Sequence, residues 1–144
     1  MKLILECDGA CRGNPGLGAI GGVINDEAGR VLTEISRFIG KCTNNIAEYQ
    51  ALIAVLECAR SMQATQVEVF SDSELMVKQI NGHYKVKSTE LRALYLQVIH
   101  LAASFDSFKI SHVLRTQNRR ADFLANQAFK SGLTIINYYD SIYN

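Results

Sequence analysis

Long hydrophobic runs, paired cysteines and prolines are scarce in this sequence of 144 residues. No apolar stretch approaches the roughly 20 residues that a helix needs to cross a membrane. Residues 1–6 are too few and too soon acidic for a signal peptide, so we expect a cytoplasmic protein that does not enter a membrane. The four cysteines lack C-x-x-C spacing and the three histidines are scattered, which argues against zinc and favours free thiols.

The formal net charge is only +1, but the charges are unevenly distributed. Residues 1–74 carry six Lys or Arg against ten Asp or Glu, whereas residues 75–144 carry nine against four. An acidic patch beside a basic one suits a metal-dependent enzyme that acts on a polyanion. Such asymmetry is also common by chance, so it indicates this class of enzyme only weakly.

A chain of this length, with a hydrophobic content of 48%, can bury a substantial core. We find no internal repeat, low-complexity segment or linker. We therefore expect a single domain over residues 1–144, with a catalytic core of about residues 1–130 and a C-terminal tail over residues 131–144. No long apolar stripe is left over, which favours a monomer.

Hydrophobic periodicity and turn residues divide the chain into strands and helices. The expected strands are residues 2–8, 19–26, 30–39, 67–70 and 107–114. The expected helices are residues 44–61, 73–81, 88–103 and 118–131. Residues 9–18 hold four glycines and the only proline, which predicts a tight loop. The apolar, tyrosine-rich residues 131–144 predict either a docked tail or a short added strand.

The order of these elements predicts the topology. Three strands joined by short turns form an antiparallel meander, whereas the later strands arrive through helices and can lie parallel to the first. The expected fold class is α/β, a mixed five-stranded sheet with helices on both faces.

Four acidic side chains stand at unusual places in these elements. Asp8 and Asp72 end two strands that are expected to be parallel neighbours, so both emerge at the same edge of the sheet. Glu48 shares a helix face with core residues, and Asp122 lies in the first turn of the last helix. Each acid alone has an ordinary explanation as a strand end, a cap or a flank residue favoured by the helix dipole. All four together are much less well explained in this way.

Carboxylates that converge on one point repel each other and raise each other's pKa values. Divalent cations relieve this repulsion, and a set of oxygen ligands without His or Cys favours Mg²⁺ or Mn²⁺ over zinc. Two such ions about 4 Å apart can clamp the attacking and leaving oxygens of a phosphoryl displacement.

Four segments, which span the chain to about residue 130, resemble in order the motifs of type 1 ribonuclease H. They are Asp8-Gly9-Ala10 with Gly13-Asn14-Pro15-Gly16, Thr43 to Tyr49, Ser71-Asp72-Ser73, and Asn118 to Asn126. The resemblance implies a ribonuclease H-like fold and an endonuclease that cuts the RNA strand of an RNA/DNA hybrid, leaving a 5′-phosphate and a 3′-hydroxyl. It also implies two Mg²⁺ ions (Mn²⁺ is possible), one activating water and one stabilising the leaving 3′ oxygen. Their ligands would be Asp8, Glu48, Asp72 and Asp122.

The resemblance assigns a role in substrate binding to three asparagines and a threonine. Asn14, Asn44 and Asn45 would read the 2′-hydroxyls that distinguish RNA from DNA, and Thr43 would lie near a phosphate of the DNA strand. Ordinary structural roles remain open, because Asn14 precedes a proline in a turn and Asn44 is a suitable helix N-cap.

Basic side chains are the expected phosphate contacts, although an ordinary solvated surface explains each of them about equally well. They are Lys85, Lys87, Arg115, Arg119 and Arg120. Residues 82–88 pass directly to the next helix, so the chain resembles compact family members without a basic protrusion, and we expect a steep salt dependence of binding. Many members place a mobile histidine before the last helix; here Arg115 occupies that short loop, whereas His112 falls within the fifth strand.

Two further hypotheses come from other classes. A non-catalytic module that binds RNA/DNA hybrids on the same fold would be favoured by loss of any one acid, and none is lost. A nuclease or strand-transfer enzyme acting on DNA would leave the Thr43-Asn44-Asn45 run without a 2′-hydroxyl to read. Fold alone would not separate these hypotheses.

Overall fold

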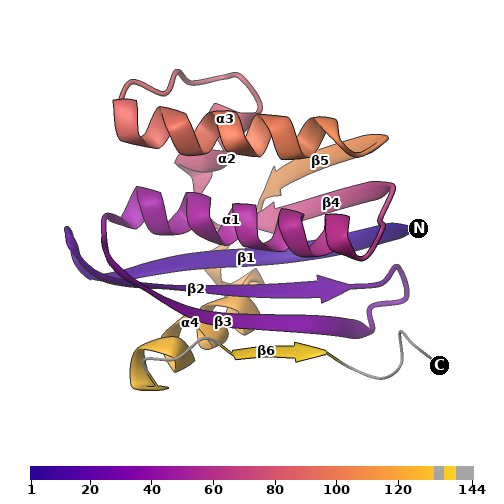
Figure 1. Cartoon of the computed structure of the whole chain (residues 1–144), viewed down its shortest axis with the longest axis horizontal. Helices are drawn as coiled ribbons and strands as arrows, with labels where there is room; N and C mark the ends of the chain where they lie inside the picture. The colour runs from indigo at the N-terminus through magenta and orange to yellow at the C-terminus, as the bar shows by residue number, and fades with distance from the viewer. Residues whose placement is uncertain (132–134, 139–144) are drawn as a thin grey trace.

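The computed structural model describes residues 1–131 and 135–138 (Figure 1). Its centre is a six-stranded sheet in the order β5-β4-β1-β2-β3-β6. The strands are β1 (Lys2–Gly13), β2 (Gly16–Asn25), β3 (Val31–Cys42), β4 (Gln66–Ser71), β5 (Ser107–His112) and β6 (Ile135–Tyr138). The first three form an antiparallel meander, and β4 and β5 continue the sheet in parallel with β1. The predicted mixed sheet is therefore confirmed.

A sixth strand extends the predicted five-stranded sheet. β6 pairs antiparallel with residues 33–36 of β3, so the tail contributes the short added strand that was one of the two expectations. Residues 132–134 and 139–144 of the expected tail lie outside the described residues.

The prediction of a tight loop over residues 9–18 was wrong. β1 continues to Gly13 and β2 begins at Gly16, so the turn itself is only Asn14 and Pro15. Most of these glycines serve close packing rather than turning. A Cβ on Gly9 would lie 2.2 Å from a backbone atom of Ala47 in the next helix. The clustered glycines predicted a loop, because a sequence does not distinguish glycines that permit close packing from glycines that permit a turn.

The helices lie close to their predicted ranges. They are α1 (Asn44–Ser61), α2 (Glu74–Ile80), α3 (Thr89–Ala103) and α4 (Arg119–Ser131), with a short 3₁₀ helix η1 (Arg115–Gln117) before α4. Side-chain oxygens of Thr43, Ser73 and Ser88 cap the first three by accepting backbone N–H donors. α1 packs on one face of the sheet and against α3, which lies beside it, whereas α4 covers the opposite face (Figure 1). None of the helices in the described ranges is long and apolar enough to span a membrane.

α4 rests directly on the backbone of β2 and β3. A Cβ on Gly21 would lie 2.0 Å from the carbonyl oxygen of Ala121, so only glycine allows this approach. The Ser36 hydroxyl donates to the carbonyl of Leu124. Glu34, which is 2% exposed, accepts from Arg120 Nη2 at 2.9 Å. These contacts fix the start of α4 against the sheet.

We predict that Gly21→Ala lowers the free energy of unfolding by about 3 kcal/mol, because the new methyl group collides with the backbone of α4. Urea unfolding measures this loss. Gly29→Asn is the matched control, since Gly29 has a φ of 85° and no atom within 4 Å of an added Cβ. Asparagine tolerates that backbone conformation, so the control should change stability by less than about 1 kcal/mol. Equal losses in the two variants would contradict the close packing of α4.

Candidate active site

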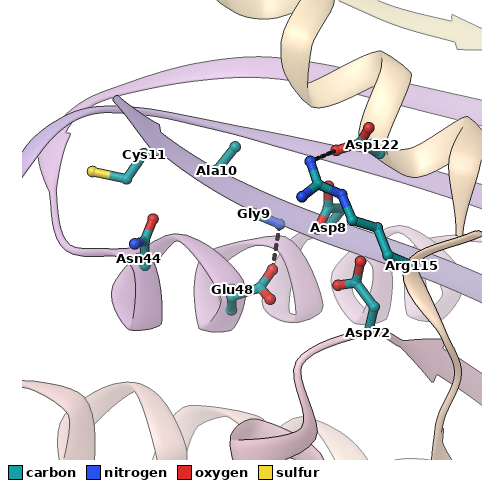
Figure 2. Close-up of a pocket in the computed structure, with 9 residues that line it drawn as sticks. All are labelled: Asp8, Gly9, Ala10, Cys11, Asn44, Glu48, Asp72, Arg115 and Asp122. Atoms are coloured by element: carbon teal, nitrogen blue, oxygen red, sulfur yellow. Dashed lines mark hydrogen bonds and ion pairs between the residues drawn. The ribbon is translucent and has the colours of Figure 1, made fainter. Parts of the chain in front are cut away.

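The parallel pairing of β1 and β4 brings two aspartates to one edge of the sheet. Their last paired residues are Cys7 and Ser71, so Asp8 and Asp72 follow at the same level. The close approach at Gly9 lets α1 place Glu48 beside them, and the Gly9 N–H donates to the Glu48 carboxylate. Carboxylate oxygens of Asp8, Glu48 and Asp72 lie within 4.8 Å of one another (Figure 2).

The fourth predicted acid, Asp122, reaches the same cavity from α4. The side chain of Asn118, which is 0% exposed, donates from Nδ2 to the carbonyl of Cys7 at 2.9 Å. The Asp122 N–H in turn donates to the carbonyl of Asn118 at 3.1 Å. Asn118 thus ties the start of α4 to the residue before Asp8. The Asp122 carboxylate lies outside the 4.8 Å group and accepts from Arg115 at 3.4 Å.

These carboxylates surround a cavity of about 420 Å³ (Figure 2). Its lining combines the four acids with the β1 backbone, one asparagine and one arginine. The lining residues are Asp8, Gly9, Ala10, Cys11, Asn44, Glu48, Asp72, Arg115 and Asp122. The structure therefore brings the four acids to one cavity, three of them in close contact.

Proximity and burial strongly raise the pKa values of two of the acids. Burial raises the pKa of Asp8 to about 10, and the charges of Glu48 and Asp72 act in the same direction. Burial also raises the pKa of Glu48 to about 8, against the opposing effect of its hydrogen bond from Gly9. Holding these groups ionised at neutral pH is therefore costly unless a cation lies between them.

The donor set fits a hard divalent cation. Three carboxylates supply oxygen ligands at one point, and none of the cavity-lining residues is a histidine. Oxygen ligands favour Mg²⁺ or Mn²⁺, whose positive charge would relieve the repulsion described above.

The predicted substrate-binding asparagines gather at the start of α1, next to the cavity. The Asn14 side chain, in the β1–β2 turn, accepts from the Asn44 N–H at 3.1 Å. Thr43 caps the helix, so the side chain of Asn44 is not used as the cap. Asn45 follows on the exposed first turn.

The predicted basic contacts other than Arg119, the exposed first residue of α4, separate into three groups. Arg115 lines the acid cavity, and its side chain is 78% exposed. Lys85 and Lys87 line a different cavity of about 500 Å³ between the α2–α3 loop and α3. Arg120 is committed to the buried Glu34. His112 is the last residue of β5, as expected, and does not line the acid cavity.

Sequence reasoning gave no role to Asn118, although the residue lies in a quoted motif. Its signal was a polar residue four positions before Asp122, at the point where a helix begins. What makes the residue important is its burial against β1, which depends on the tertiary fold.

The segment between α2 and α3 contains no further helix. Residues 81–88 run as turns and extended chain from one helix to the next. The predicted absence of a basic protrusion at this point is confirmed.

Comparison with known proteins agrees with this architecture. The family model described as "Reverse transcriptase-like" matches residues 6–128. A bifunctional protein of Mycobacterium tuberculosis is 43% identical over 129 residues, covering 89% of this chain but 35% of that protein. The chain thus spans about a third of that relative. A ribonuclease H of Chlorobium phaeobacteroides is 32% identical over 146 residues, covering 90% of this chain and 97% of the relative.

Solved structures give the same result. RNase H1 from Halobacterium salinarum superposes with a TM-score of 0.89 at 40% identity, covering 91% of this chain and 99% of that one. LC11-RNase H1, solved in complex with an RNA/DNA hybrid, has a TM-score of 0.86 at 41% identity and covers 90% of this chain and 98% of its own. These matches show that the chain belongs to the type 1 ribonuclease H family, and the direct connection between α2 and α3 makes it a compact member.

Proposed function

We propose that the protein is a metal-dependent endoribonuclease that hydrolyses the RNA strand of RNA/DNA hybrids. The observation that carries this proposal is the convergence of Asp8, Glu48 and Asp72 within 4.8 Å in an open cavity. The names of the relatives and the hybrid bound to LC11-RNase H1 support the choice of substrate.

Asp8, Glu48, Asp72 and Asp122 would hold two Mg²⁺ ions, with Mn²⁺ as an alternative. When bound, such ions supply a water nucleophile and stabilise charge on the leaving 3′ oxygen. The chain's own contribution is placement. The Gly9 N–H holds the Glu48 carboxylate toward Asp8, and Arg115 offsets the charge of Asp122. Water adds to phosphorus as the bond to the 3′ oxygen breaks, which leaves a 5′-phosphate and a 3′-hydroxyl.

The start of α1 would read the RNA strand. Asn14, Asn44 and Asn45 carry amide groups that can both donate to and accept from a 2′-hydroxyl. Their placement beside the acid cavity supports this role. Thr43 would lie against the DNA strand, whereas Lys85, Lys87 and Arg115 would contact phosphates. The monomeric state and the cytoplasmic location stay predictions from the sequence.

We predict that the protein cuts only the RNA strand of an end-labelled hybrid, in the presence of Mg²⁺ or Mn²⁺ and not with a chelator. Asp72→Asn should lower the rate by at least about 1,000-fold, because it removes one of the converging carboxylates. Asp106→Asn is the matched control, since Asp106 is an exposed residue outside the acid cavity and should leave the rate unchanged.

The same assay separates the alternatives. Hybrid binding without cutting, in wild type and Asp72→Asn alike, would favour the non-catalytic module. Cutting of duplex DNA at a rate similar to that of the hybrid would contradict recognition of the 2′-hydroxyl by the asparagines.

We predict that Asp8→Asn stabilises the metal-free protein by about 1–2 kcal/mol near pH 8, because the amide, unlike the buried Asp8 carboxyl, does not have to take up a proton on folding. The Asp8 carboxyl has a folded pKa of about 10, against roughly 4 in the unfolded chain. At any pH between these two pKa values, unfolding releases a proton from Asp8. The stability of metal-free wild type therefore falls as the pH rises.

Urea unfolding in chelator at about pH 6 and about pH 9 measures this effect. Wild type should lose more stability across this interval than Asp8→Asn, and Mg²⁺ should stabilise wild type more than the variant. A variant less stable than wild type at both pH values would contradict the repulsion between the acids.

A further inference from the structure

β1 continues beyond the acid cavity, where no strand among the described residues pairs with its edge opposite β2. Its pairing with β4 ends at Cys7, whereas its pairing with β2 continues to Gly13. Side chains alternate along a strand, so Asp8 and Arg12 point to the same face, about 13 Å apart. This face is the one that α4 covers, since Asp8 pairs with Gly21 and Gly21 contacts Ala121.

α4 runs alongside this extension and meets it at both ends. Asp122, in its first turn, lines the same cavity as Asp8. Seven residues and about 10 Å further along the helix, the Phe129 ring lies under the Arg12 guanidinium, whose central carbon is 4.4 Å from the ring centroid. The two elements therefore hold an acidic pair at one end and a stacked arginine at the other.

The stacking positions the arginine without using its hydrogen-bond donors. A guanidinium on an aromatic face keeps its N–H groups directed outward in the plane. Arg12 is exposed, and it forms no ion pair within the part of the chain that the structure describes. Arg30, Arg115 and Arg120, in contrast, each pair with a carboxylate.

The surroundings of Arg12 favour an anionic ligand. Neither residues 9–25 nor residues 35–47 contain an aspartate or a glutamate. Arg12 pairs with Leu17 and Leu17 pairs with Lys41, so a second exposed cation lies on the same face two strands away. The Arg12 donors match a phosphate group, and the charge of Lys41 adds positive potential to the same face.

We propose that Arg12, held by Phe129, binds a backbone phosphate of the RNA strand a few nucleotides from the cleaved bond. This inference rests on the proposed function. The RNA strand is the one assigned because Arg12 shares a strand and a face with Asp8. Successive phosphates of one strand lie at least about 3.4 Å apart, so the 13 Å separation reaches at most roughly four nucleotides from the cavity.

The first experiment measures hybrid affinity against salt concentration in an Asp72→Asn background, in which the RNA should stay intact. Adding Arg12→Ala should weaken binding about 5- to 10-fold at low salt and reduce the slope of log affinity against log salt by about 0.7–0.9. Phe129→Leu should weaken binding about 2- to 3-fold, since the cation stays but is no longer held. Arg12→Lys should keep the salt slope.

Arg60→Ala is the matched control. Arg60 is an exposed arginine in the last turn of α1, at the opposite end of that helix from Asn44. Its removal changes the net charge equally and should leave affinity and slope unchanged. Thermal unfolding of each variant reports any loss of fold. Unchanged affinity and slope in Arg12→Ala would overturn the inference.

The second experiment locates the phosphate. Hybrids whose RNA strand is shortened stepwise on one or the other side of the cleaved bond are tested with wild-type Arg12 and with Arg12→Ala. Wild type should lose affinity when one arm falls below about four nucleotides, and the penalty of Arg12→Ala should vanish on the same hybrid. A penalty that persists on all shortened hybrids, or that vanishes only when the DNA strand is shortened, would overturn the inference.

The failure of this inference is distinct from failure of the proposed function. If the wild-type chain neither binds nor cuts the hybrid, both are wrong. If it binds and cuts, and Arg12→Ala does so equally well at every salt concentration, only the role of Arg12 is wrong.

Discussion

The convergence of three mutually repelling carboxylates, one buried and two half-buried, is the constraint on which the rest of this structure depends. Asp8, Glu48 and Asp72 hold ligand oxygens within 4.8 Å of one another, and burial raises the pKa values of Asp8 and Glu48 strongly. Repulsion would move these carboxylates apart into water if the backbone allowed it. The parallel pairing of β1 with β4 and the hydrogen bond from Gly9 to Glu48 prevent this separation. The fold thus keeps an unfavourable arrangement ready for a cation.

Two glycines, which carry no side chain, let the helices approach the sheet closely enough to form the site. Gly9 allows α1 to touch β1, which places Glu48, and Gly21 allows α4 to touch β2, which places Asp122. Asn118 then joins α4 to β1 through the carbonyl of Cys7. The same two elements continue past the acids to Arg12 and Phe129, so one packing arrangement supports both the site and the proposed phosphate contact.

Much of the site could be predicted, because the position of each acid within its strand or helix indicates where its side chain lies. Asp8 and Asp72 end strands that were expected to be parallel neighbours, and Glu48 stood on or beside the core-facing stripe of a periodic helix. The path of residues 9–18 could not be predicted, because glycines that permit close packing resemble glycines that permit turns. The separation of Lys85 and Lys87 from the acid cavity depends on how the α2–α3 loop lies on α3, for which the sequence holds no periodic signal. The tail remained ambiguous since its pairing with β3 is non-local.

Calorimetric titration of Mg²⁺ into the metal-free protein, in buffers of different ionisation enthalpy, tests the central claim most directly. The acids of this site should bind the cation saturably and release protons as they do so, because Asp8 and Glu48 have pKa values of about 10 and about 8 without it. Asp72→Asn should greatly weaken this binding. Saturable binding that is unchanged in Asp72→Asn, or no binding at all, would contradict a cation site at the three carboxylates.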